Sequence, residues 1–124
     1  MKRAMVVLMA LVLLTAPCWA GEKAAQKGQD VTITGHLSCA YCKLAAGPVH
    51  KCSPECCQAC IKAGDSTLLQ HDKNIYLLLN KEKDKPLMTA ERIALAGGDV
   101  TVKGILVKTS GLQAIYVESM EKAK

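Results

Sequence analysis

The feature that most constrains this chain is a group of six cysteines that all lie within residues 39–60. The other cysteine of the 124 residues is Cys18, near the N-terminus. Cysteine at this density indicates a disulfide framework, a metal site or a redox centre, and the compartment helps to decide among them. The six residues are Cys39, Cys42, Cys52, Cys56, Cys57 and Cys60.

The N-terminal segment predicts an exported protein. Two basic residues follow Met1, residues 4–15 are almost wholly apolar, and a small-x-small cleavage pattern ends at Ala20. An apolar run of this length fits a signal peptide and is too short to span a bilayer. We therefore predict a signal peptide over residues 1–20, no membrane span in the mature chain, and a periplasmic or secreted location, which is oxidising. Acylation of Cys18 is the weaker alternative.

The composition of the mature chain argues against several function classes. Loss of residues 1–20 removes the only Trp and two basic residues, so the formal net charge falls from +5 to +3. Three Tyr and no Phe remain, which leaves few aromatic side chains to stack on nucleic-acid bases. No Ser-His-Asp arrangement, paired-carboxylate motif or glycine-rich phosphate loop is recognisable in the sequence. We therefore predict neither nucleic-acid binding nor enzyme activity.

Hydrophobic periodicity predicts one mainly β domain with two short helices over residues 31–119. The expected strands cover residues 31–37, 67–70, 75–79, 100–108 and 112–119. A helix over residues 89–96 separates the third and fourth strands, which is the element order of a small five-stranded OB-like Greek-key barrel. A glycine inside the first strand and another inside the fourth predict bends. Residues 21–30 are expected to be a flexible tail, and residues 120–124 a frayed end.

The cysteines occupy an expected insertion between the first and second strands, residues 38–64. Residues 38–52 have no clear period and predict an irregular loop. A short helix then begins at residues 53–55, because Ser is a good N-cap, Pro suits the first helical position and an acidic side chain favours the first turn. Helical spacing places the three cysteines of this helix together on its inward face.

Four segments carry a resemblance to a group of known proteins. They are Gly35-His-Leu-Ser-Cys39, His50-Lys-Cys52, Asn74-Ile-Tyr-Leu-Leu-Leu79 and Gly97-Gly-Asp-Val-Thr-Val-Lys-Gly104. Together with a Cys-x-x-x-Gly that ends at Gly64, the pattern resembles small secreted bacterial cysteine-rich domains of OB-fold-like type, whose activity is unassigned. The resemblance extends over residues 30–118. It implies the barrel fold and export, and it implies no particular chemistry.

The cysteine spacing favours a bound metal ion. Cys39-x-x-Cys42 and Cys57-x-x-Cys60 are two thiolate pairs of the kind that close a tetrahedron around zinc. Soft thiolates also suit monovalent copper. We therefore predict an exported module that binds zinc or copper, with His36 as a weaker candidate ligand. The main candidate ligands are Cys39, Cys42, His50, Cys52, Cys56, Cys57 and Cys60.

Two alternatives to a metal site stay open at this point. In an oxidising compartment six cysteines also suit three disulfides, with fifteen pairings to choose from, and the barrel face then serves a protein partner or a small ligand. Thiol–disulfide exchange is the weaker alternative: a helix start lowers thiol pKa values, but the chain lacks the βαβ context of a thioredoxin fold. The expected partner is therefore a metal ion or a periplasmic protein, and the oligomeric state is left open.

Overall fold

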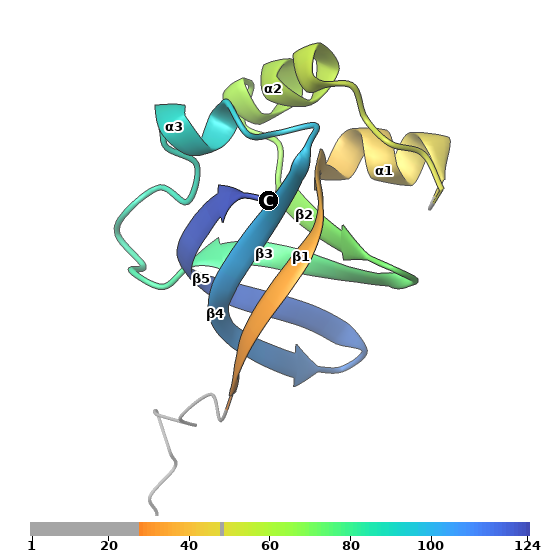
Figure 1. Ribbon diagram of the computed structural model, residues 1–124. Coiled ribbons are helices and arrows are strands. Elements are labelled where there is room, and N and C mark those ends of the chain that lie inside the picture. The colour runs from red at the N-terminus through yellow and green to blue at the C-terminus, as the bar shows by residue number, and fades with distance from the viewer. Residues whose placement is uncertain (1–27, 48) are drawn as a thin grey trace, which may run out of the picture.

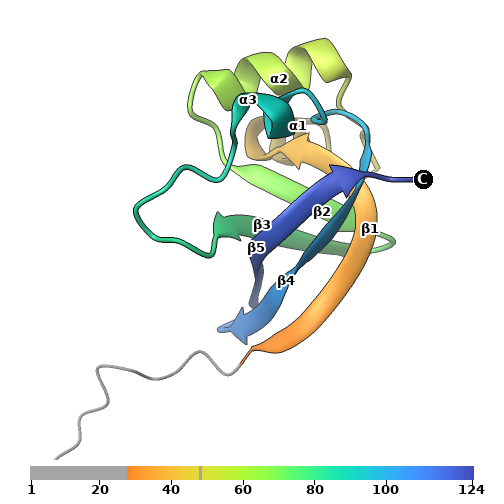
Figure 2. The same ribbon diagram turned by 60° about the vertical axis from the view of Figure 1, so that its left-hand side comes forward.

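The computed structural model describes residues 28–47 and 49–124. The predicted signal peptide, with Cys18, and most of the predicted tail lie outside the described residues. Five strands of the described chain form a closed barrel, and three short helices gather at one end of it (Figure 1, Figure 2). In chain order the elements are β1 (Gln29–Cys39), α1 (Ala40–Ala46), α2 (Pro54–Lys62), β2 (Thr67–His71), β3 (Asn74–Asn80), α3 (Ala90–Ile93), β4 (Asp99–Thr109) and β5 (Leu112–Lys122).

The barrel has the strand order β1-β2-β3-β5-β4 and closes between β4 and β1. Neighbouring strands are antiparallel except for β3 and β5, which run parallel. β1 pairs with β4 along its first part and with β2 along its last part, and His36 has a partner on both sides. The predicted mainly β, five-stranded OB-like barrel is confirmed, and α1 and α2 lie in the β1–β2 connection.

Two strand glycines lie where the neighbouring backbone comes close. A Cβ atom at Gly35 would overlap the carbonyl oxygen of Gln70, and a Cβ atom at Gly104 would overlap that of Tyr116. The β4–β5 pairing also shifts register between Lys103 and Gly104. Glycine is therefore needed at both positions for the close strand approach that a small, strongly curved barrel requires.

The helix content differs from the sequence-based expectation. The irregular loop predicted over residues 38–52 is wrong for residues 40–46, which form α1; its alanine-rich sequence has a high helix propensity, and this outweighs the missing periodicity. α3 covers only Ala90–Ile93, so it is shorter than the helix predicted over residues 89–96. None of the helices in the described part of the chain has the length and apolar character needed to cross a membrane.

Strands β1 and β5 extend further than their hydrophobic patterns predict. β5 continues to Lys122 because its pairing with β4 continues as far as Val100, and Met120 is buried in the core. The frayed end predicted at the C-terminus is therefore wrong for residues 120–122. The flexible tail predicted over residues 21–30 is likewise wrong for residues 29 and 30, because β1 begins at Gln29, where it pairs with the second half of β4.

The core fills the barrel with aliphatic side chains from every strand. Burying one such side chain stabilises a fold by about 1.5–3 kcal/mol. This small core is therefore the main support for the helices that cover one end of the barrel. Its buried members include Leu37, Leu69, Leu78, Val100, Val102, Ile115 and Val117.

Truncation of the core should be costly. Leu69 in β2 is fully buried, so we expect Leu69→Ala to lower the free energy of unfolding by about 2–5 kcal/mol. The matched control is Leu112→Ala, because Leu112 lies in β5 and is 52% exposed. Urea unfolding of both variants checks this, and similar losses for the two variants would contradict the assigned core.

Candidate metal centre

Helix α2 begins at the residues that the sequence predicts. The Ser53 side chain accepts a hydrogen bond from the backbone N–H of Cys56 at 3.4 Å, and Pro54 is the first helical residue. Gly64, with φ +102°, follows the end of the helix in a conformation that favours glycine. The start of α2 thus places two adjacent cysteines in its first turn and a third one turn later.

The loop before β4 fixes the start of α2 against the barrel. The backbone N–H of Gly97 donates to the carbonyl of Leu37 at 2.8 Å, and the N–H of Leu37 donates to the carbonyl of Gly98 at 2.9 Å. A Cβ atom at Gly97, whose φ is +84°, would overlap the backbone of Pro54. The end of β1 and the start of α2 are therefore held together through this loop.

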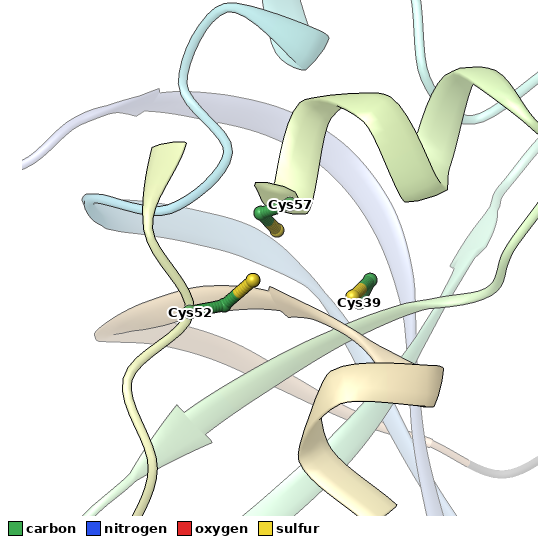
Figure 3. Close-up of side chains that lie close together, drawn as sticks. All are labelled: Cys39, Cys52 and Cys57. Carbon is green, nitrogen blue, oxygen red and sulfur yellow. The ribbon is translucent and has the colours of Figure 1, made fainter. Parts of the chain in front are cut away.

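Three buried cysteines from three different segments meet in this region. Cys39 is the last residue of β1, Cys52 lies in the α1–α2 connection, and Cys57 lies in the first turn of α2. Their Sγ atoms all lie within 4.8 Å of one another, and Figure 3 shows the three side chains pointing toward a common centre. Three thiolates that converge in this way are able to bind one soft metal ion.

The other cysteines extend this group, so that all six form one cysteine cluster. Two further triads have the same property, with all Sγ atoms within 4.8 Å of one another. The Sγ atoms of Cys42 and Cys56 lie 3.4 Å apart at the edge of the cluster. All six cysteines are free thiols in this structure. The two further triads are Cys39 with Cys42 and Cys60, and Cys42 with Cys52 and Cys56.

The cysteine cluster runs from the barrel core to the surface. Cys39 and Cys57 are fully buried and Cys52 is 3% exposed. Cys42 and Cys60 are half-buried, and Cys56 is exposed. One end of the cluster is therefore shielded by protein, and the other end is open to an ion from solvent.

The surroundings keep these thiols protonated while no cation is bound. Burial raises the pKa of Cys52 to about 12 and the pKa of Cys57 to about 11. Hydrogen bonds with Cys39 and then with Cys56 raise the pKa of Cys42. Thiols with raised pKa values are weak nucleophiles. A metal ion reverses this preference, because it binds the thiolate and displaces the proton.

Lys43 is a residue of this region that the sequence analysis did not single out. It lies in α1 directly after Cys42, is only 3% exposed, and donates from Nζ to the carbonyl of His50 at 2.6 Å. Burial lowers its pKa, and the negative charge of a Cys52 thiolate would raise it. A buried lysine beside clustered cysteines supplies positive charge where thiolates would be negative. Its position immediately after a Cys-x-x-Cys pair was the available sequence signal.

The two candidate histidines lie differently from the cysteines. His50 is exposed, and no triad found among the described residues contains it, so its role as a ligand stays a prediction. The backbone carbonyl of His50 accepts a hydrogen bond from Lys43, which places the His50 backbone, but not its imidazole, beside the cluster. His36 is 9% exposed and its Nδ1 atom lies 3.3 Å from Oδ1 of Asp99. The structure thus brings together the six predicted cysteines and neither imidazole.

The seating of α2 on Gly97 can be tested with two glycine variants. Gly97 and Gly111 both have a positive φ, +84° and +82°, so alanine at either position costs about 1–2 kcal/mol. Only Gly97→Ala also forces a Cβ atom into the Pro54 backbone, whereas a Cβ at Gly111 meets nothing within 4 Å. We expect Gly97→Ala to lose more stability in urea unfolding and to make Cys57 reactive toward a bulky alkylating reagent. Equal losses and an unreactive Cys57 would contradict this seating.

Comparisons with known proteins give no relative from which a function could be transferred. No protein-family model, no curated protein and no solved structure matches this chain. What can be said of function therefore depends on the barrel and on the cysteine cluster at its end. Six sulfur atoms within metal-binding distance of their neighbours are compatible with a bound metal ion.

Proposed function

We propose that this protein binds a thiophilic metal ion, zinc or copper, through the cysteine cluster. The observation that carries the proposal is the convergence of Cys39, Cys52 and Cys57 within 4.8 Å in a buried position. These residues come from a strand, a connection and a helix, so the fold itself brings them together. Metal binding, and no catalytic step, is the proposed role.

The sulfur neighbourhood favours metal over a set of disulfides. A disulfide joins each sulfur to one partner at about 2.05 Å. Here Cys39, Cys42 and Cys52 each belong to two triads, so each has several sulfur neighbours within 4.8 Å. The Cys42–Cys56 distance of 3.4 Å is well beyond a bond. Shared neighbours of this kind suit ligands around an ion, because one ion binds several sulfurs at once.

The thiol chemistry also disfavours the redox alternative. An exchange catalyst needs a thiol whose pKa is lowered toward neutral pH. Burial instead raises the pKa of Cys52 and that of Cys57, although Cys57 lies in the first turn of a helix. These thiols fit the role of ligands that a cation deprotonates better than the role of attacking nucleophiles.

The proposed setting is the periplasm or the cell exterior, and it follows from the predicted signal peptide. Free thiols there oxidise unless something protects them. A bound ion provides that protection, because the thiolates that hold it are no longer free to pair. Storage, sensing or transfer of the metal is the class of role that such an exported module would serve.

The composition of the native protein tests this proposal directly. We expect intact-mass measurement of the full chain, expressed with its own N-terminal segment and purified without added metal or reductant, to show bound zinc or copper. Denaturation and chelation should then release six thiols. A metal-free protein whose mass is six hydrogens lower would contradict metal binding and support three disulfides.

A further inference from the structure

The three triads of the cysteine cluster are not independent sites, because they share sulfurs. Any two of them have one sulfur in common: Cys39, Cys42 or Cys52. Each of these three thiols therefore faces two triads. The remaining cysteines, Cys56, Cys57 and Cys60, each complete one triad, and all three lie on α2.

This pattern of sharing has a simple geometric form. Six points arranged as an octahedron have four alternate faces, and any two of those faces share one corner. The three observed triads have this relation. The fourth alternate face would then be Cys56, Cys57 and Cys60, a set that is not among the triads whose sulfurs lie within 4.8 Å of one another. Cys60 lies four residues after Cys56 and three after Cys57, spacings that place Cβ atoms about 5–6 Å apart on one side of a helix. Cys56 and Cys57 are adjacent in sequence and do not face each other, so a fourth ion would have to draw these three sulfurs together. Helix α2 thus carries all three sulfurs that a fourth site would use.

We propose that the cysteine cluster holds four monovalent copper ions in a single polynuclear copper–thiolate centre, with one ion at each of the three observed triads and the fourth at the three cysteines of α2. This deepens the proposed metal-binding function and rests on it. Each ion binds three sulfurs, and each sulfur bridges two ions. Soft thiolates select monovalent copper, which accepts three ligands, whereas a structural zinc site requires four ligands in a tetrahedron. Each triad supplies three sulfurs.

The charge balance of loading fits the surroundings of the cluster. Six thiols release six protons to solvent, four Cu⁺ ions bind, and no electron is transferred, so the centre carries a net charge of −2. The amino group of Lys43 is buried beside the cluster at the level of α1. The positive end of the α2 dipole also faces Cys56 and Cys57 in its first turn. Both features stabilise an anionic centre.

The burial gradient gives the centre an entrance. Cys56 is exposed and its sulfur is 3.4 Å from that of Cys42, so the triad that contains both is the one nearest to solvent. Cys39 and Cys57 are fully buried and belong to triads farther inside. Copper would enter and leave at the Cys42–Cys56 edge, while the inner sulfurs stay shielded from oxidants.

The loading stoichiometry tests the four-ion centre. The full chain, fully reduced, is titrated under anaerobic conditions with a copper(I) complex against a competing copper(I) chelator, and native mass spectrometry counts the ions. We expect a plateau at four ions, with the empty and four-copper forms dominating at intermediate loading because shared sulfurs make binding cooperative. The luminescence typical of polynuclear copper(I) thiolates should grow with the four-copper form.

The contrary outcomes separate this inference from the proposed function. A plateau at fewer than four copper ions, or binding of a single zinc ion in preference to copper, overturns the four-ion centre and leaves metal binding standing. Failure of the six reduced thiols to bind either metal overturns both.

Two cysteines outside the Cys-x-x-Cys pairs provide the sharpest variants. In a zinc-like site built from those pairs, Cys52 and Cys56 are dispensable. In the shared centre each bridges two ions, so Cys52→Ser and Cys56→Ser should both lower the copper count and abolish the luminescence. Cys56 is exposed, so its loss leaves the barrel intact, and the circular dichroism of the empty protein checks this. Ala59→Ser, at an exposed position of α2, is the control that should still bind four ions, and wild-type loading of Cys56→Ser would contradict the proposal.

Discussion

The structure depends on the pairing of β1 with two different strands. β1 closes the barrel against β4 and then continues along β2 to Cys39, where the chain turns directly into α1. Near this end, Leu37 exchanges backbone hydrogen bonds with the Gly97–Gly98 loop that supports α2. The first sulfur of the cluster is therefore fixed by the barrel itself. The sulfurs of α2 are positioned through the loop that β1 holds, so the site inherits its geometry from the fold.

The cluster requires a small domain to bury several ionisable thiols close together. Neutral thiols pack as small apolar groups, so the metal-free protein is able to bury Cys39 and Cys57 without leaving a charge in the core. The same burial raises the pKa of Cys57, which means that ionisation needs a compensating cation. A bound metal ion would supply that compensation to several sulfurs at once, and Lys43 would add positive charge nearby. For this physical reason we prefer sulfurs that bind a common metal ion over sulfurs that are joined in separate disulfide pairs.

Much of the fold could be predicted from the sequence, because its signals are local. Alternating apolar residues mark the strands, and Ser53-Pro54 marks the start of α2. The sequence analysis missed α1 because its short alanine-rich run lacks a clear apolar stripe. Its position in the fold follows from the chain, since α1 begins directly after Cys39 at the end of β1. The six cysteines were predicted as candidate ligands from their spacing, and the structure brings them together. Three features could not be predicted, because they depend on contacts between segments that are distant in the sequence. These are the sulfur neighbours that the triads share, the burial of Lys43 and the separation of His36 from the sulfurs.

The proposed metal centre requires that the sulfurs meet around metal and not in pairs. X-ray absorption at the copper edge of the loaded native protein tests this most directly. We expect a first shell of three sulfurs per copper, with no nitrogen or oxygen ligand, and a second shell of neighbouring copper ions. A first shell of nitrogen or oxygen atoms would contradict metal binding by the sulfurs, whereas sulfur-bound copper without copper neighbours would contradict only the four-ion centre.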